Sequence, residues 1–287
     1  MTAIPVSIPD TEVHRLRSEI VEDDFELWIA KPQAGFATAS LASPTLLFVL
    51  DANLCFGTAV EMTRIMHKLY GELPPILVVG VAYPTADGFR QAALRSRDFT
   101  PSQGAGLTAM AASLPQPIHS VEPPMGGADR FLRFLAEEAK PFVASRFAFA
   151  PTQSTIFGSS LGGLLVTYAL LKKPAMFDNF IAVSPSLWWD NEMMFDVAST
   201  LSDWGLPKQI FLAVGGLEEA PEIPMLAQFK AITNVRRMAA QLAQQVPPLT
   251  VKLDVLPEET HTSVIPVALT RGLRSCLQNS SDKAASA

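Results

Sequence analysis

The sequence predicts an α/β fold in which one mostly parallel sheet carries helices on both faces. Short apolar runs alternate six times with segments of helical spacing along the 287 residues. These runs are apolar throughout, which is typical of parallel strands buried on both faces. No internal repeat or linker interrupts this pattern. We therefore expect residues 1–287 to form a single domain.

The N-terminal part differs from the rest, because residues 25–31 alternate apolar and polar side chains. Together with residues 11–18, they predict an antiparallel hairpin at the edge of the sheet. The further expected strands are 46–50, 76–83, 154–157, 180–184, 209–214 and 250–256. The expected helices are 57–70, 128–146, 161–173, 190–201, 225–245 and 264–277.

Two segments lie outside this pattern. Residues 84–127 are rich in Pro, Gly, Ser and Ala and show no sustained period, so we predict a long loop that shapes substrate choice. Residues 279–287 are small and polar and predict a flexible tail.

The charge, the apolar runs and the cysteines of the sequence limit which partners and cofactors the protein is expected to have. The net charge is −6 and no basic block occurs, which argues against nucleic acid or an anionic membrane as partner. No apolar run is long enough to span a bilayer and no secretion signal precedes the first strand, so a cytoplasmic location is expected. Cys55 and Cys276 are far apart, which suits a reducing compartment. Neither metal-ligand spacing nor a nucleotide-binding glycine loop is present, so no metal or cofactor is expected.

The chemistry centres on the run Gly-Ser-Ser-Leu-Gly at 158–162. It contains Gly-x-Ser-x-Gly between a predicted strand and a predicted helix, the context of a nucleophile elbow. The motif alone arises by chance in roughly one chain in ten of this length, and a small-residue turn that packs a helix on a strand is the simpler alternative. The context favours Ser160 as nucleophile, with the N–H of Leu161 as an oxyanion donor at a helix N-terminus.

A serine nucleophile needs a base and an acid, which follow in the chain order Ser, acid, His in this type of site. His261 follows the last predicted strand and is the expected base. Glu218, Glu219 and Glu222 all follow the strand 209–214 and are candidates for the acid. Glu218 is the first choice, because one short turn separates it from the strand.

The remaining site residues are assigned from their positions. The backbone N–H of Asn53, after the strand 46–50, is the expected second oxyanion donor. His119 lies in the long loop and is a candidate substrate contact. Trp188 is either a core anchor or the wall of a pocket. Arg97 either pairs with Asp98 to hold the loop or meets an anionic group of the substrate.

Several motifs together resemble a known family. They are Leu50-Asp51-Ala52-Asn53, Arg97-Asp98-Phe99-Thr100-Pro101, Gly126-Gly127-Ala128, Gly158-Ser159-Ser160-Leu161-Gly162-Gly163, Ser184-Pro185-Ser186-Leu187-Trp188-Trp189 and His261-Thr262-Ser263-Val264. The chain resembles the esterase D-like branch of α/β-hydrolases, and within it the short siderophore esterases that cleave the trilactones of enterobactin, salmochelin and bacillibactin. The resemblance covers nearly the whole chain.

This resemblance implies an α/β-hydrolase fold and a serine hydrolase without cofactor. It supports Ser160 and His261 strongly and Glu218 less, because the acid is not uniformly placed in the family. Ala52 stands where the family usually has glycine, which could shift the oxyanion loop.

We therefore expect a serine carboxylic ester hydrolase that acts on small-molecule esters through a Ser-His-Glu triad and an acyl-enzyme. The alternatives are an acyltransferase with the same triad and a non-catalytic binding protein on a hydrolase fold. A monomer and a homodimer both remain open.

Overall fold

A computed structural model of the chain describes residues 6–36, 44–104, 125–147, 153–200, 208–245 and 249–278. Within these residues lies one eight-stranded sheet of order β1-β2-β4-β3-β5-β6-β7-β8. Its first strand pairs antiparallel with the second, and the second pairs antiparallel with β4. The other neighbours are parallel. The bounds are β1 Thr11–Ser18, β2 Asp23–Ala30, β3 Thr45–Val49, β4 Ile76–Ala82, β5 Ser154–Ser159, β6 Asn179–Val183, β7 Lys208–Gly215 and β8 Leu249–Leu256.

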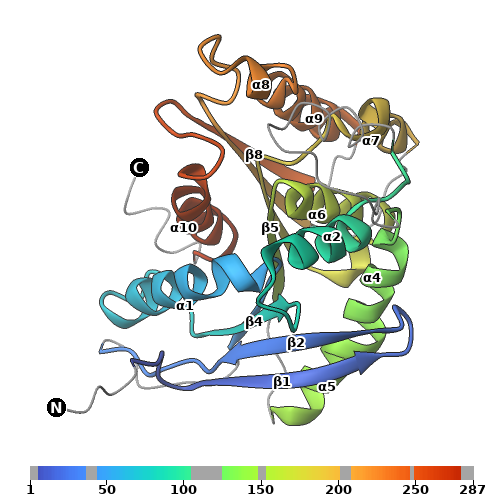
Figure 1. Ribbon diagram of the computed structural model, residues 1–287. Coiled ribbons are helices and arrows are strands. Elements are labelled where there is room, and N and C mark those ends of the chain that lie inside the picture. The colour runs from blue at the N-terminus through green and yellow to red at the C-terminus, as the bar shows by residue number, and fades with distance from the viewer. Residues whose placement is uncertain are drawn as a thin grey trace, which may run out of the picture.

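Helices cover both faces of the sheet. Figure 1 shows α1 (Ala52–Lys68) and α10 (Val264–Leu277) together on one side, and α2 (Gly88–Phe99), α4 (Ala128–Phe134) and α6 (Leu161–Lys172) on the other. The second side also carries α5 (Lys140–Arg146), α7 (Trp189–Ser199) and α9 (Ala231–Gln245), and α8 (Pro224–Ala227) precedes α9. No helix in the described ranges combines the length and the apolar character needed to cross a bilayer. This is the α/β-hydrolase architecture that the sequence predicted.

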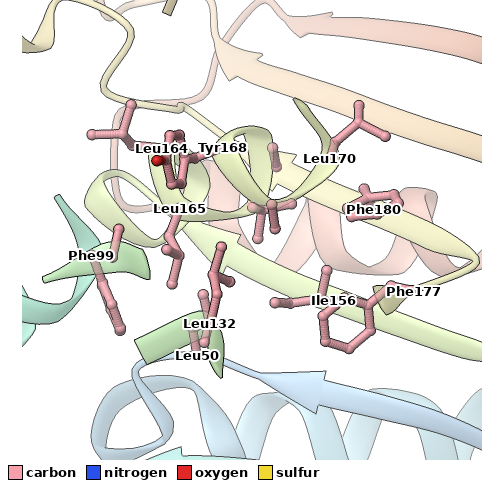
Figure 2. Packing of buried hydrophobic residues seen from close by; sticks show 14 of the residues in the cluster. Leu50, Phe99, Leu132, Ile156, Leu164, Leu165, Tyr168, Leu170, Phe177 and Phe180 are labelled. Atoms are coloured by element: carbon pink, nitrogen blue, oxygen red, sulfur yellow. The ribbon is translucent and has the colours of Figure 1, made fainter. Parts of the chain in front are cut away.

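The core is divided by the sheet into two hydrophobic layers. Along β5, Ile156 packs in the layer beneath α6 and the neighbouring Phe157 in the layer beneath α1 and α10. Every residue of α6 from Leu161 to Leu171 is buried. Figure 2 shows its leucines packed against Ile156, Phe180 and residues of α2 and α4. Burial of each large apolar side chain contributes about 1.5–3 kcal/mol, so this strand and helix form a rigid base for the turn between them.

The structure corrects the expectation that residues 84–127 lack regular structure. Helix α2 occupies Gly88–Phe99 and begins at Asp87, whose carboxylate accepts hydrogen bonds from the backbone N–H groups of Phe89 and Arg90. Few of its residues are large and apolar, and one of its faces borders a cavity. Residues 105–124 lie outside the described part of the chain.

Three helix boundaries also differ from the expectation. Helix α1 begins at Ala52 rather than at residue 57. The single helix expected over 225–245 is divided into α8 and α9, because Lys230 adopts a positive φ of 50° between them. The helix expected over 128–146 is continuous but contains a π-helical turn at Leu135–Ala139.

Candidate active site

Ser160 occupies a strained turn between β5 and α6. Its φ of 58° and ψ of −119° are unusual for a residue with a side chain and typical of a nucleophile elbow. A Cβ on Gly158 would lie 2.5 Å from the carbonyl oxygen of Gly162, so only glycine fits there. A Cβ on Gly163 would likewise lie 2.8 Å from the Val183 carbonyl oxygen, whereas a Cβ on Gly162 would come no closer than 3.3 Å, to Asp51 Oδ2.

Two helix N-termini meet beside this turn. Leu161 is the first residue of α6 and Asn53 the second of α1, so their backbone N–H groups have no acceptor within their own helices. The Asn53 side chain is engaged by the backbone of Tyr83, donating to its carbonyl at 3.0 Å and accepting from its N–H at 2.9 Å. The side chain is therefore occupied, and the backbone amide is the group that Asn53 can offer to an oxyanion.

Glu218 and His261 form a close pair at the same edge of the sheet. The carboxylate Oε2 of Glu218 lies 2.6 Å from His261 Nδ1. The other oxygen, Oε1, accepts hydrogen bonds from Ser184 Oγ at 2.5 Å and from the Gly215 N–H at 2.8 Å. Glu218 is only 2% exposed. These donors satisfy a carboxylate that would otherwise be costly to bury.

The other two candidate acids lie elsewhere. The carboxylate of Glu219 accepts from the N–H and the hydroxyl of Thr233. Glu222 is exposed to solvent. Of the three glutamates, Glu218 is the one that contacts the imidazole of His261.

Ser160 and His261 border a common cavity of about 560 Å³. In this structure the Ser160 hydroxyl is 3.5 Å from Ser186 Oγ, and the described contacts include no hydrogen bond between Ser160 and His261. The imidazole side chain is 34% exposed. In serine hydrolases the bond between nucleophile and base is often long without substrate, and the shared cavity leaves both groups accessible to one ligand.

Faces of three helices form the cavity wall. Helices α1 and α2 lie on two sides of the cavity, and the start of α10 forms a third side. The lining residues are Asp51, Asn53, Leu54, Cys55, Thr58, Tyr83, Gly88, Gln91, Ala92, Arg95, Ser159, Ser160, His261, Thr262, Ile265 and Pro266. The spacing 88, 91, 92, 95 is that of one helical face, a signal in the sequence that could have identified this wall.

An ion pair within this wall was not recognised from the sequence. Arg95 donates from Nε and a terminal nitrogen to both carboxylate oxygens of Asp51, at 2.8 and 2.9 Å. Asp51 adopts a left-handed conformation with φ of 52° directly before α1. The pair therefore links α2 to the start of α1, which carries the Asn53 amide. Beside it, burial and then the Asp51 charge raise the pKa of the Cys55 thiol to about 12.

The structure places the three proposed substrate contacts away from this cavity or outside the described residues. Arg97 donates to Asp98 at 2.7 and 2.9 Å and to Asp23 at 2.7 Å. This arrangement favours the alternative in which Arg97 holds its segment in place over contact with an anionic substrate. Trp188 stacks on Phe229 with ring centroids 4.5 Å apart, which favours an anchor over a cavity wall. His119 lies outside the described residues.

Comparison with known proteins shows which family the chain belongs to. Residues 32–248 match the family described as "Putative esterase". The chain belongs to this esterase family. It is a carboxylic ester hydrolase, as its relatives are named esterases and hydrolases.

Relatives of the esterase match it over different shares of its length. Ferri-bacillibactin esterase BesA of Bacillus subtilis is 32% identical over 289 residues, covering 96% of this chain and 92% of that protein. A siderophore enterobactin esterase of Emericella nidulans is 34% identical over 165 residues, covering 56% of this chain and 52% of that protein. Among solved structures, siderophore hydrolase EstB of Aspergillus nidulans superposes with a TM-score of 0.81 at 24% identity, covering 96% of this chain and 97% of that one. This superposition confirms the fold.

Proposed function

We propose that the esterase hydrolyses small-molecule esters through an acyl-enzyme, with Ser160 as nucleophile, His261 as base and Glu218 as acid. The observation that carries this proposal is the 2.6 Å contact between Glu218 and His261 beside the cavity that Ser160 borders. The strained elbow at Ser160 supports it, because such strain persists mainly where function requires it.

The reaction follows from the arrangement of donors and acceptors. Nδ1–H of His261 donates to Glu218, which leaves Nε2 free to take the proton of the Ser160 hydroxyl as it attacks the ester carbonyl. The N–H groups of Leu161 and Asn53 stabilise the oxyanion. The imidazolium then gives its proton to the leaving alkoxide. A water activated by His261 hydrolyses the acyl-enzyme and regenerates Ser160.

Siderophore-type esters are the substrates we propose for this site. The relatives are named for ferri-bacillibactin and enterobactin, and the alignment with the first spans nearly the whole chain. A cavity of about 560 Å³ is large enough to enclose one arm of such a molecule. We place the protein in the cytoplasm, where a siderophore would be opened after uptake.

The test is Ser160→Ala, assayed with a short p-nitrophenyl ester and a catecholate trilactone. We expect kcat to fall by at least ~10⁴-fold on both esters and covalent labelling by a fluorophosphonate to disappear, while the circular dichroism spectrum is unchanged. Ser159→Ala, which removes the neighbouring hydroxyl, is expected to retain the label. Normal turnover by Ser160→Ala would refute the assignment. Turnover of aryl esters without the trilactone would refute the substrate class alone.

A further inference from the structure

Ser184 is a buried residue in contact with the proposed triad acid. It directly follows β6, is 2% exposed, and its hydroxyl donates to Glu218 Oε1 at 2.5 Å. Its hydroxyl takes no part in the proton transfers between Ser160 and His261.

The backbone of Ser184 is strained. Its φ is 42°, a value that residues with a side chain rarely adopt because it is sterically unfavourable. Two hydrogen bonds hold this conformation: the Ser184 N–H donates to the Ala213 carbonyl at 2.7 Å, and the Ser186 N–H donates to the Ser160 carbonyl at 3.1 Å. The segment after β6 is therefore tied both to the strand that leads to the acid and to the nucleophile.

The contact constrains how the carboxylate is oriented. A glutamate side chain has three rotatable bonds, and His261 Nδ1 contacts only Oε2 of Glu218. The opposite oxygen has two donors, the Ser184 hydroxyl and the Gly215 N–H. Removal of the hydroxyl leaves a single donor on Oε1, so the carboxylate can rotate away from the imidazole.

We propose that Ser184 is a positioning residue for ester hydrolysis, whose hydroxyl holds Glu218 in the orientation that directs His261 towards Ser160. This inference rests on the triad proposed above. It predicts a loss in the chemical step without a loss in substrate binding, because Ser184 does not border the cavity.

The test compares Ser184→Ala and Ser184→Gly. Both remove the hydroxyl, but glycine also relieves the positive φ, so it supplies a folded variant if alanine does not. The concentration of active sites is first titrated with a fluorophosphonate. We expect kcat per labelled site to fall about 10- to 150-fold in both variants, the effect of one charge-assisted hydrogen bond, with KM unchanged. The low-field proton NMR signal of His261 Nδ1–H is expected to shift in both.

Ser18→Ala is the matched control. Ser18 is also buried, and its hydroxyl also donates to a glutamate, Glu138, at 2.6 Å. It lies on β1, the edge strand at the other end of the sheet from β8. We expect this variant to lose thermal stability while kcat per labelled site and the His261 signal remain those of the wild type.

Three outcomes decide between the possibilities. Wild-type kcat and an unshifted His261 signal in both Ser184 variants would show a purely stabilising role and overturn the proposal. Full activity in Ser184→Gly with loss in Ser184→Ala would assign the effect to backbone strain and overturn it as well. Absence of labelling in the wild-type protein would instead refute the proposed function.

Discussion

Replacement of Glu218 by glutamine is expected to disable His261 without disturbing the fold. The structure determines how the new amide would point. Oε1 faces the N–H of Gly215 at 2.8 Å, and a backbone N–H can only donate. The carbonyl oxygen of the glutamine must therefore face Gly215, and its NH₂ group must face His261 Nδ1. An NH₂ donor stabilises the tautomer that carries its proton on Nε2, and this tautomer cannot accept the proton of Ser160.

The expected loss follows from the loss of the active tautomer. We expect kcat to fall on the order of 10³- to 10⁴-fold, which corresponds to about 4–5.5 kcal/mol of activation free energy at 1.36 kcal/mol per decade. The side chains are isosteric and Glu218 keeps the same neighbours, so the free energy of unfolding is expected to change by no more than about 2 kcal/mol.

The assay is steady-state hydrolysis of a p-nitrophenyl ester, normalised to folded protein, with urea unfolding measured in parallel. Glu219→Gln and Glu222→Gln are the matched controls, because Glu219 binds Thr233 and Glu222 is exposed. Each control is expected to stay within about twofold of wild-type kcat, as surface substitutions usually do. If Glu218→Gln retained more than a tenth of wild-type kcat, or if a control lost as much, the acid would have been assigned to the wrong glutamate.

Three further predictions concern charged and nucleophilic groups. Arg95→Met leaves the Asp51 carboxylate, 8% exposed, without its cation, and the free energy of unfolding in urea should fall by about 2–4 kcal/mol. Adding Asp51→Asn to this variant should restore part of the lost stability. Strictly additive losses in the double variant would contradict the pairing. The pKa of Cys55 is raised to about 12, so little of the reactive thiolate is present at pH 8 in the folded protein. Iodoacetamide at pH 8 should therefore label Cys55 at least ~100-fold faster in urea than in the native esterase. Equal labelling rates would argue against burial of the thiol. Burial, together with the charge of Lys208, lowers the pKa of Lys140 from 10.5 to about 8. Between pH 8 and 10.5 the Lys140 amine is neutral in the folded protein and protonated in the unfolded chain, so the unfolded chain binds more protons. The free energy of unfolding of the wild type should therefore rise relative to that of Lys140→Met across this range, by up to about 1.4 kcal/mol per pH unit. A constant difference in unfolding free energy between the two proteins would contradict the lowered pKa.

The local pattern of the sequence was sufficient for most of the fold. The edge strand was expected at 11–18 and the last helix at 264–277, and β1 and α10 have these bounds. Such segments are predictable because burial of one face, or of both, leaves a period in the order of side chains. The Gly-x-Ser-x-Gly turn was likewise recognisable, since a turn as tight as that at Gly158 restricts residue type within a few positions.

Helix α2 was missed for the same physical reason. Its inner face borders a cavity through Gly88, Gln91 and Arg95, so the segment contains few large apolar side chains and its sequence is mostly polar or small. Arg97 also looked available for substrate, because its partner Asp23 lies 74 residues away along the chain.

The sequence by itself determined that this chain builds a parallel sheet and presents a serine at its edge. Only the tertiary structure decided which glutamate meets His261, which serine donates a hydrogen bond to that glutamate, and which arginine borders the cavity. The reason is that the apolar period of a strand or helix depends on residues that are close together in the sequence. The pairing of Glu218 with His261 and Ser184 depends instead on how three loops, far apart in the sequence, are positioned in the fold. Those loops follow β6, β7 and β8, and the register of the sheet brings their ends together.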